Sequence, residues 1–226
     1  MLSILIPCFN EENIIYENIN KLLIWSTKQN FKSEIIVINN GSTDKTESEL
    51  RKFEEEDAVL ILNEKLKGKG FAIKRGLENC KYNKAVILDA DLSAGINELK
   101  MEWLEADNLL IIGSRPLGNE INTPLIRKFS GIVLNFIIRK IFNLNYLDTQ
   151  CGFKFLSTDK INEITNGLSC KGFLYDLDLI LICLQLQINI EEKPVNYYFN
   201  RDSSVSLFRD SIAMLKDVFI LKKKYN

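Results

Sequence analysis

The sequence contains no histidine, and this absence excludes several classes of enzyme. Without any histidine among its 226 residues, the chain has no Ser-His-Asp triad, histidine general base or histidine-ligated zinc site. Any metal must therefore be held by carboxylates, carbonyls, hydroxyls or thiolates. A large excess of positive charge is also missing: 29 Lys and Arg stand against 30 Asp and Glu. The net charge of −1 argues against nucleic acid as a partner.

Cysteine is scarce, and long apolar runs are absent. The five cysteines are scattered and form no CxxC pair, a pattern typical of proteins in a reducing compartment. We expect these cysteines to be buried and to pack as small apolar residues. No apolar run approaches the roughly 20 residues of a membrane-spanning helix, and the N-terminus has no basic stretch of a signal peptide. We therefore expect a cytoplasmic protein that contacts membranes only at its surface.

What the sequence does contain is a regular alternation of short apolar runs with segments of helical periodicity. The runs, predicted to be strands, are Leu2–Ile6, Glu34–Ile38, Ala58–Leu62, Ala85–Leu88 and Leu109–Ile112. Between the first two, apolar residues of 14–23 fall on one helical face. This alternation predicts an α/β protein with a mostly parallel central sheet and helices on both faces.

The regular alternation of short apolar runs and helical segments ends after Arg115. We predict helices over Thr123–Leu144, Leu177–Leu186 and Ser206–Lys224, a strand over Gly152–Leu156 and an extended segment over Ile188–Phe199. No linker or repeat interrupts the chain. The sequence predicts one domain over 1–226, with a ligand-binding half at 1–115, a second half at 116–200 and a C-terminal amphipathic helix at 201–226.

Polar clusters follow each of the five predicted strands. In open α/β sheets ligands bind at the carboxyl ends of the strands, so these clusters predict a site. Asp89-Ala90-Asp91 is the most informative, because two carboxylates two residues apart in extended backbone point to the same side. There they can share Mg²⁺ or Mn²⁺; the alternative is a polar turn that caps a helix near Ile96.

Lys69, between two glycines, is a candidate to hold phosphate oxygens. The spacing of a P-loop is absent, and no GxGxxG follows a strand. ATPases with a P-loop and dinucleotide-dependent oxidoreductases are thereby disfavoured.

Four of these clusters, with their strands, resemble glycosyltransferase family 2: Ile4–Glu12, Glu34–Asp44, Asp89–Ser93 and Gly113–Arg115. The second half resembles the branch of dolichyl-phosphate β-glucosyltransferases and related polyprenyl-phosphate glycosyltransferases, through Asp148–Lys154, Tyr175–Asp178, Glu192–Val195 and Asp210–Asp217. The resemblance implies the GT-A fold, a nucleotide-sugar donor and a divalent metal, Mn²⁺ or Mg²⁺.

The resemblance also implies roles for individual residues. Pro7, Phe9 and Glu11 correspond to the nucleoside pocket, and Asp44 and Ala90 belong to the matching donor-binding motifs. Asp89 and Asp91 correspond to the metal motif. Arg115 and Arg127 correspond to basic residues near the diphosphate and the acceptor phosphate, and Asp148 lies in the acceptor-loop motif.

Three features depart from the family pattern. Asn39-Asn40 replaces the usual pair of aspartates, so Asn40 stands where an aspartate contacts the base. Asp202-Ser203-Ser204 lacks a phosphate-binding lysine; Arg201 either replaces it or is a solvated surface arginine. The N-terminal membrane anchor of some eukaryotic relatives is not expected.

The acceptor decides whether the chemistry needs a base. A phosphate monoester has a second pKa of about 6 and is largely dianionic at pH 7, so it needs cations around it but no base. If the acceptor is a hydroxyl, Asp176 is the candidate base; alternatively, Asp176 caps the helix that begins near Leu177.

We therefore predict an inverting transfer of a hexose, with UDP-glucose the preferred donor, onto a dolichyl or polyprenyl phosphate. The alternatives are GDP-mannose as donor, a glycan or protein hydroxyl as acceptor, or a non-catalytic nucleotide-sugar-binding protein. The apolar residues of Phe129–Leu144, with basic residues at both ends, and Lys222–Lys224 suit peripheral contact with the cytosolic face of a membrane. Core packing is the alternative for Ile132, Val133, Phe136, Ile137 and Ile141. We also allow for a membrane-protein partner.

Overall fold

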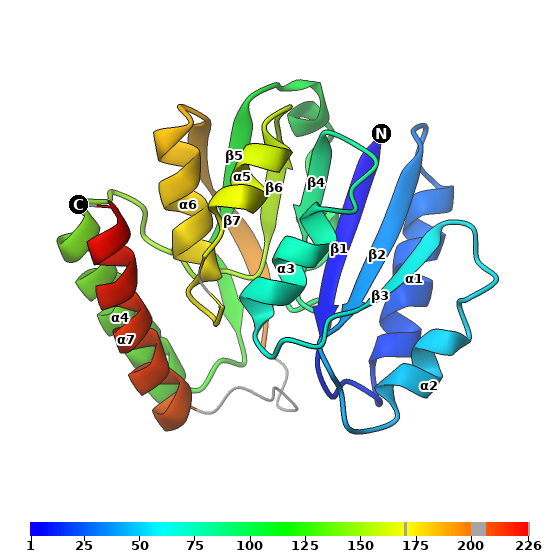
Figure 1. Cartoon of the computed structure of the whole chain (residues 1–226), viewed down its shortest axis with the longest axis horizontal. Coiled ribbons are helices and arrows are strands. Elements are labelled where there is room, and N and C mark those ends of the chain that lie inside the picture. Colours follow the sequence, from blue (N-terminus) through cyan, green and yellow to red (C-terminus); the bar gives the residue numbers. More distant parts are fainter. Residues whose placement is uncertain (170, 200–206, 226) are drawn as a thin grey trace.

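The computed structural model describes residues 1–169, 171–199 and 207–225 (Figure 1). Strands and helices alternate through the first half as predicted. Its elements are β1 (Leu2–Cys8), α1 (Ile15–Thr27), β2 (Ser33–Asn39), α2 (Thr46–Arg51), β3 (Val59–Asn63), α3 (Lys69–Leu77), β4 (Lys84–Ile87) and the 3-10 helices η1 (Ile96–Glu98) and η2 (Met101–Glu105). The second half contains β5 (Leu109–Ile121), α4 (Leu125–Phe142), β6 (Lys154–Ser157), α5 (Ile161–Gly167), α6 (Tyr175–Gln185), β7 (Asn189–Tyr198) and α7 (Leu207–Tyr225).

One seven-stranded sheet, in the order β3-β2-β1-β4-β6-β5-β7, joins the two halves of the chain. Strands β1 to β4 pair in parallel, and so do β5 and β7. Strand β6 is inserted antiparallel between β4 and β5. The predicted α/β class, with a mostly parallel central sheet, is confirmed.

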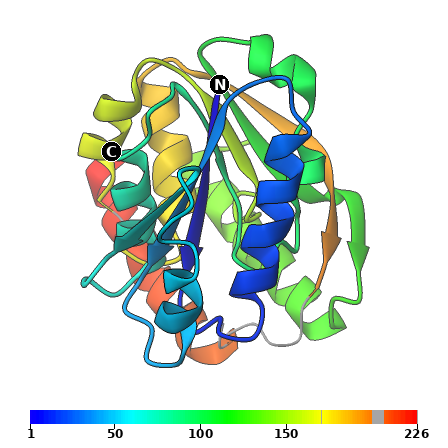
Figure 2. The ribbon, with the colours of Figure 1, turned by 90° about the vertical axis from the view of Figure 1, so that its right-hand side faces the viewer.

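Helices cover both faces of this sheet, and each face has its own apolar core. Alternate strand residues point to opposite faces, so Leu5, Ile36 and Ile38 pack against α3 and α6, whereas Ile4, Ile35 and Val37 pack on the side of α1 and η2. Figure 2 shows α1 and the layer of α3 and α6 on opposite sides of the sheet. The carboxyl ends of β1, β2 and β4 are thereby left uncovered for a site.

Strand β5 is longer than its apolar run. We predicted a strand over Leu109–Ile112, but pairing with β7 continues to Ile121 across an irregularity between Ser114 and Asn119. Gly118 lies there so close to β7 that a Cβ would come within 2.1 Å of the Val195 carbonyl oxygen. The extension is specified by this partner strand, so the local pattern did not reveal it. The short helices α2 and α5 were not predicted either.

Helices α4 and α7 pack side by side at one end of the molecule (Figure 1). Asn135 and Ile138 of α4 and Val218 and Leu221 of α7 face the interior. Core packing was the wrong interpretation for Ile132, Val133 and Phe136, which are exposed. No helix in the described part of the chain is both long enough and apolar enough to span a membrane.

Candidate active site

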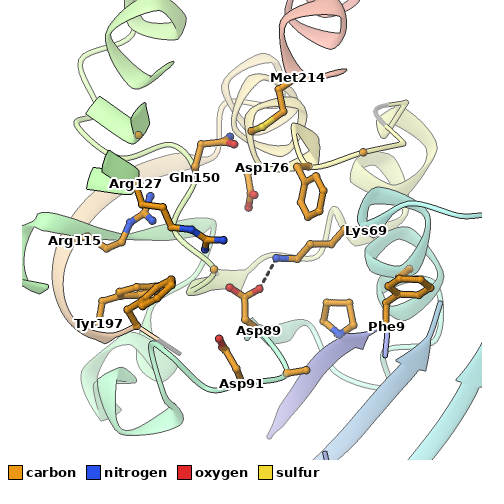
Figure 3. A pocket seen from close by; sticks show the side chains of 18 of the residues that line it. Phe9, Lys69, Asp89, Asp91, Arg115, Arg127, Gln150, Asp176, Tyr197 and Met214 are labelled. Carbon is orange, nitrogen blue, oxygen red and sulfur yellow. Dashed lines mark hydrogen bonds and ion pairs between the residues drawn. The ribbon is translucent and has the colours of Figure 1, made fainter. Parts of the chain in front are cut away.

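A cavity of about 500 Å³ opens at the carboxyl ends of β1 and β4. Its walls come from the loops after these strands, the N-terminus of α3, the first half of α4 and the end of β7 (Figure 3). Most predicted site residues line it: Pro7, Phe9, Glu11, Asn40, Lys69, Asp89, Ala90, Asp91, Arg115, Arg127 and Asp176. Residues that are far apart in the sequence thus form one site.

The two aspartates after β4 lie in a tight turn. The Leu92 amide donates to the Asp89 carbonyl at 2.9 Å, and Leu92 has a φ of 51°. The expected extended backbone is therefore wrong, and the polar turn before η1 is the observed conformation. Both carboxylates nevertheless face the cavity (Figure 3). Asp91 is oriented by Ser93, whose amide and hydroxyl donate to it at 2.9 and 2.6 Å.

Lys69 is the counter-ion of Asp89. Its ammonium group, from the first residue of α3, is paired with the Asp89 carboxylate. Burial opposes the charge of Lys69, but the carboxylates of Asp89, Asp176 and Asp91 outweigh it and raise the pKa of Lys69. Burial likewise opposes ionisation of Asp89, yet Lys69 prevails and lowers the pKa of Asp89. For Asp91, burial and repulsion from Asp89 raise the pKa.

The donor set at this turn fits a hard divalent ion. Among the residues that the structure describes, no three acidic or thiol side chains come together as a metal cage. Mg²⁺ in phosphate-transfer sites is usually bound by one or two carboxylates, with substrate phosphates and water completing its shell. Asp89 and Asp91 are such a pair, and Lys69 would be free to move to a phosphate when a cation took its place.

Arg115 is held by Asp148, which lies outside the cavity. The Arg115 Nε and Nη2 atoms donate to the two Asp148 carboxylate oxygens at 2.6 and 2.9 Å. Burial opposes ionisation of Asp148, but Arg115 and backbone amides outweigh it and lower the pKa of Asp148. Glu192 fixes the backbone around Asp148, because its carboxylate accepts hydrogen bonds from the amides of Leu147 and Asp148 at 2.8 and 2.7 Å.

Asp148, which the resemblance assigns to the acceptor-loop motif, thus lies behind the wall of the cavity. Asp148 is 1% exposed and does not line the cavity. Arg115 lines it instead, and its guanidinium lies over the Tyr197 ring at 5.4 Å from the centroid. Arg127, in the first turn of α4, lines the same wall and stacks on Phe199.

Asp176 lies within α6, whose first residue is Tyr175. The alternative of an N-cap is thus wrong: the cap position is Leu174. The Asp176 carboxylate lines the cavity and is paired with Lys154, whose side chain is fully buried. Burial raises the pKa of Asp176, and Lys154 acts in the opposite direction. Sequence reasoning missed Lys154, although a lysine between two phenylalanines of a buried strand was a signal.

The end of the cavity that is predicted to hold the nucleoside is built by the loops after β1 and β2. Phe9 and Pro7 present apolar surface there, with Phe9 37% exposed. Asn40 uses both ends of its amide within the chain: its nitrogen donates to the Leu66 carbonyl at 2.7 Å, and its oxygen accepts from the Gly68 amide at 2.8 Å. An aspartate could not make the first of these bonds, so the asparagine suits this loop.

Another predicted site residue, Asp44, does not line the cavity. Asp44 accepts from the amides of Glu12 and Thr46 at 3.2 and 2.9 Å and so holds the loops after β1 and β2 together. Burial opposes the charge on Asp44, but these hydrogen bonds leave its pKa below the ordinary value. Arg201 lies outside the described residues, so its role stays a prediction.

A close approach at Gly152 completes the floor of the cavity. A Cβ at Gly152 would come within 1.9 Å of an Asp89 carboxylate oxygen, so only glycine fits. The segment 148–154 therefore contacts three charged residues of the cavity: Asp148 holds Arg115, Gly152 abuts Asp89, and Lys154 pairs with Asp176. Tyr197, Gln150 and Met214 also line the cavity and were not predicted.

Comparison with known proteins agrees with this arrangement. The chain is 27% identical over 99% of its length to the dolichyl-phosphate β-glucosyltransferase of Saccharomyces cerevisiae, covering 75% of that protein. It is 27% identical to the mouse (Mus musculus) protein of the same name, with 99% of the chain and 75% of that protein covered. A Trichomonas vaginalis protein of that name is 28% identical over 87% of the chain and 65% of its own length.

Solved structures share the fold at lower identity. Glucosyl-3-phosphoglycerate synthase from Mycobacterium tuberculosis in complex with UDP superposes with a TM-score of 0.71 at 18% identity, covering all of this chain and 79% of the other. The same enzyme with Mn²⁺, UDP-glucose and glycerol 3-phosphate gives a TM-score of 0.64, also at 18% identity, over 96% of this chain and 79% of the other. The model of glycosyl transferase family 2 matches residues 3–165. The chain therefore belongs to glycosyltransferase family 2 and has the GT-A fold.

Proposed function

We propose that this glycosyltransferase moves glucose from UDP-glucose onto a dolichyl or other polyprenyl phosphate. The observation that carries the proposal is one continuous cavity. It runs from the apolar nucleoside end at Phe9, past the carboxylates of Asp89 and Asp91, to the arginines Arg115 and Arg127 beside α4. The relatives named dolichyl-phosphate β-glucosyltransferase support the sugar and the acceptor.

The donor would lie along the β1–β4 edge. Phe9 and Pro7 would flank the base, and Lys69 would bind the diphosphate. Asp89 and Asp91 would hold Mn²⁺ or Mg²⁺, which supplies positive charge to the departing diphosphate. Glu11 and Ala90 would shape the floor between base and diphosphate, since both line the cavity.

The acceptor phosphate would lie between Arg115 and Arg127. Two phosphate groups must come close together, and their repulsion is offset by the cations that line this part of the cavity. Because a phosphate monoester is already largely dianionic at pH 7, its oxygen attacks the anomeric carbon without a base. Asp148 serves this step indirectly, since it fixes the Arg115 guanidinium.

The lipid chain of the acceptor would leave the cavity along α4. Six apolar residues at i, i+1, i+4, i+7, i+8 and i+11 form an exposed strip on this helix, which we name the α4 strip: Leu125, Ile126, Phe129, Ile132, Val133 and Phe136. An exposed apolar patch of this kind marks an interaction site. We propose that it rests on the membrane that holds the acceptor; approach from the cytosolic side and a membrane-protein partner stay predictions.

The test is transfer by the purified full chain. UDP-glucose and GDP-mannose are each supplied with Mn²⁺ or Mg²⁺ and either a short polyprenyl phosphate or the corresponding polyprenol. We expect glucose transfer to the phosphate, none to the alcohol, and loss of turnover when the metal is chelated. Transfer to a glycan or peptide hydroxyl, with none to polyprenyl phosphate, would contradict the proposal and restore Asp176 as base. Binding of donor without any turnover would favour a non-catalytic protein.

A further inference from the structure

Lys154 is a fully buried cation in the middle of the sheet. It belongs to β6, where it pairs with Ile87 of β4 and Ile112 of β5. Its ammonium group donates to the Cys151 carbonyl at 2.6 Å and forms an ion pair with Asp176. Replacing a buried ion pair by apolar residues is often neutral or stabilising. Stability alone therefore gives no reason for a lysine at this position.

The partner of Lys154 gives that reason, because Asp176 reaches the cavity. Figure 3 shows its carboxylate directed into the cavity, on the side opposite Asp91. A buried carboxylate without a cation would take up a proton; burial raises the pKa of Asp176, and Lys154 offsets part of this rise. Lys154 also limits the rotation of the carboxylate, since the ammonium group is itself fixed by the Cys151 carbonyl.

A second polar group lies on the same side of the cavity. The side-chain nitrogen of Gln150 is buried and has no hydrogen-bond partner among the residues that the structure describes. Gln150 lines the cavity, and Figure 3 shows it at the same end as Asp176. A carboxylate accepts hydrogen bonds and an amide nitrogen donates them. Hydroxyl groups, which do both, are the chemistry that this pair matches, whereas a carboxylate repels a diphosphate.

We propose that Asp176 and Gln150 bind hydroxyl groups of the transferred hexose, and that Lys154 is a positioning residue that holds the Asp176 carboxylate in place. The inference rests on the proposed function, because the hexose is the part of a nucleotide sugar that is rich in hydroxyls. It gives Asp176 a task in a reaction that needs no base.

The experiment compares the affinity for UDP with that for UDP-glucose, both with Mn²⁺, by calorimetry. UDP lacks the hexose, so a residue that binds the hexose affects only UDP-glucose. We expect Asp176→Asn and Lys154→Met each to weaken UDP-glucose binding by roughly 10-fold or more, as for the loss of a hydrogen bond to a charged group. The affinity of each variant for UDP should stay within about 2-fold of the wild-type value, because UDP has no hexose and loses no contact.

The double variant shows whether Lys154 acts only by positioning Asp176 or also contacts the hexose itself. Because Lys154 acts through Asp176, Lys154→Met combined with Asp176→Asn should cost no more than Asp176→Asn alone. Lys84→Met is the matched control: it removes a lysine of β4, the strand paired with β6, whose partner Asp107 also lies outside the cavity wall. This control should leave the affinities for UDP and UDP-glucose unchanged.

Other outcomes overturn the inference. Equal weakening of UDP and UDP-glucose binding, additive effects in the double variant, or normal UDP-glucose affinity in Asp176→Asn would each do so. If Lys154→Met does not fold, Asp176→Asn and Gln150→Ala carry the test. Wild-type protein that binds GDP-mannose in place of UDP-glucose would instead overturn the proposed donor, and the same contrast would then be measured with GDP and GDP-mannose.

Discussion

Asp89 and Asp91 lie two residues apart but have different surroundings. Asp89 is neutralised by Lys69, whereas Asp91 accepts hydrogen bonds from the amide and the hydroxyl of Ser93. A cation bound between the two carboxylates would therefore offset the negative charge of Asp91 more than that of Asp89. We expect Asp91→Asn to abolish metal-dependent turnover, because the charge on the leaving diphosphate loses its counter-ion, at a cost of several kcal/mol.

The readouts for Asp91→Asn are turnover and Mn²⁺ binding. The fold should survive, with about 1 kcal/mol of stability lost, because asparagine keeps one of the two acceptor oxygens. Asp107→Asn is the control, since the Asp107 side chain is 92% exposed and distant from the cavity wall. Near-normal activity at matched thermal stability would remove the metal assignment.

The Arg115–Asp148 pair links the site to stability at low pH. The pKa of Asp148 is lowered in the folded state, so below about pH 3.9 the unfolded chain binds this proton first. The stability that the pair contributes is present above that pH and is lost as pH falls through the folded-state pKa. Asp148→Asn should cost up to about 3–5 kcal/mol at pH 7, because it leaves the partly buried Arg115 charge without its counter-ion.

Urea unfolding at several pH values between 7 and 3 measures this effect. The variant should be less stable than wild type at neutral pH, and the difference should shrink towards pH 3. Turnover should fall as well, since Arg115 loses its fixed orientation. A difference in stability that is constant down to pH 3 would show that folding does not lower the pKa of Asp148.

Residue types at strand ends were predictable, but their partners were not. Asp89, Lys69 and Arg115 follow apolar runs, and the geometry of a parallel sheet brings such residues to one edge. Asp148 and Lys154 act through contacts across more than 20 residues of chain, and local patterns carry no signal of these pairings. Their segment was singled out by resemblance alone, and its positioning role emerged only from the structure.

At the scale of elements, α7 is anchored by its last turn. Lys224 and Tyr225 donate to the Asp178 carboxylate at 2.9 and 2.5 Å, and Asp178 is fully buried in α6. Lys224 also donates to the Gly167 carbonyl at 2.6 Å. The expectation that Lys222–Lys224 act together at a lipid surface is thus wrong for Lys224, whose ammonium group faces the protein.

We expect Lys224→Met to loosen α7 while leaving the sheet intact. Breaking a half-buried ion pair on a buried carboxylate should lower the unfolding free energy by on the order of 2–3 kcal/mol. Amide exchange measured by mass spectrometry should accelerate in 207–225 and stay unchanged in 1–115. Lys222→Met, at a neighbouring exposed lysine, is the control. Equal exchange in both variants would contradict the anchoring role.

At the scale of the whole molecule, alternation of strands and helices determined the fold class, and resemblance identified the fold. Neither revealed that β6 enters the sheet antiparallel between β4 and β5. This insertion carries Lys154 beneath the cavity, so a feature of topology supplies a residue of the site. The apolar periodicity of α4 predicted a helix correctly, but it could not say whether the apolar residues faced a core or a surface.

The α4 strip and the exposed Phe219 and Ile220 of the neighbouring helix α7 are apolar surface suited to contact with lipid. Burial of large apolar side chains should provide binding that persists at high salt. The exposed Lys222 and Lys223 should add on the order of 1 kcal/mol each on anionic lipid, fading as salt screens them. We expect the combined Phe129→Ser and Phe136→Ser variant to lose vesicle binding at all salt concentrations.

Lys222→Glu with Lys223→Glu should weaken vesicle binding at low salt only, and Lys224 is kept because it anchors α7. Co-sedimentation with vesicles of varied anionic lipid content measures both variants, and calorimetry with UDP-glucose checks that the donor site is intact. Met1 and Ile24, exposed apolar residues outside α4 and α7, provide serine substitutions as controls. If the wild-type protein binds no vesicle and yet glucosylates a soluble acceptor, the proposal of a lipid-phosphate acceptor is wrong. The α4 strip would then contact a partner other than lipid.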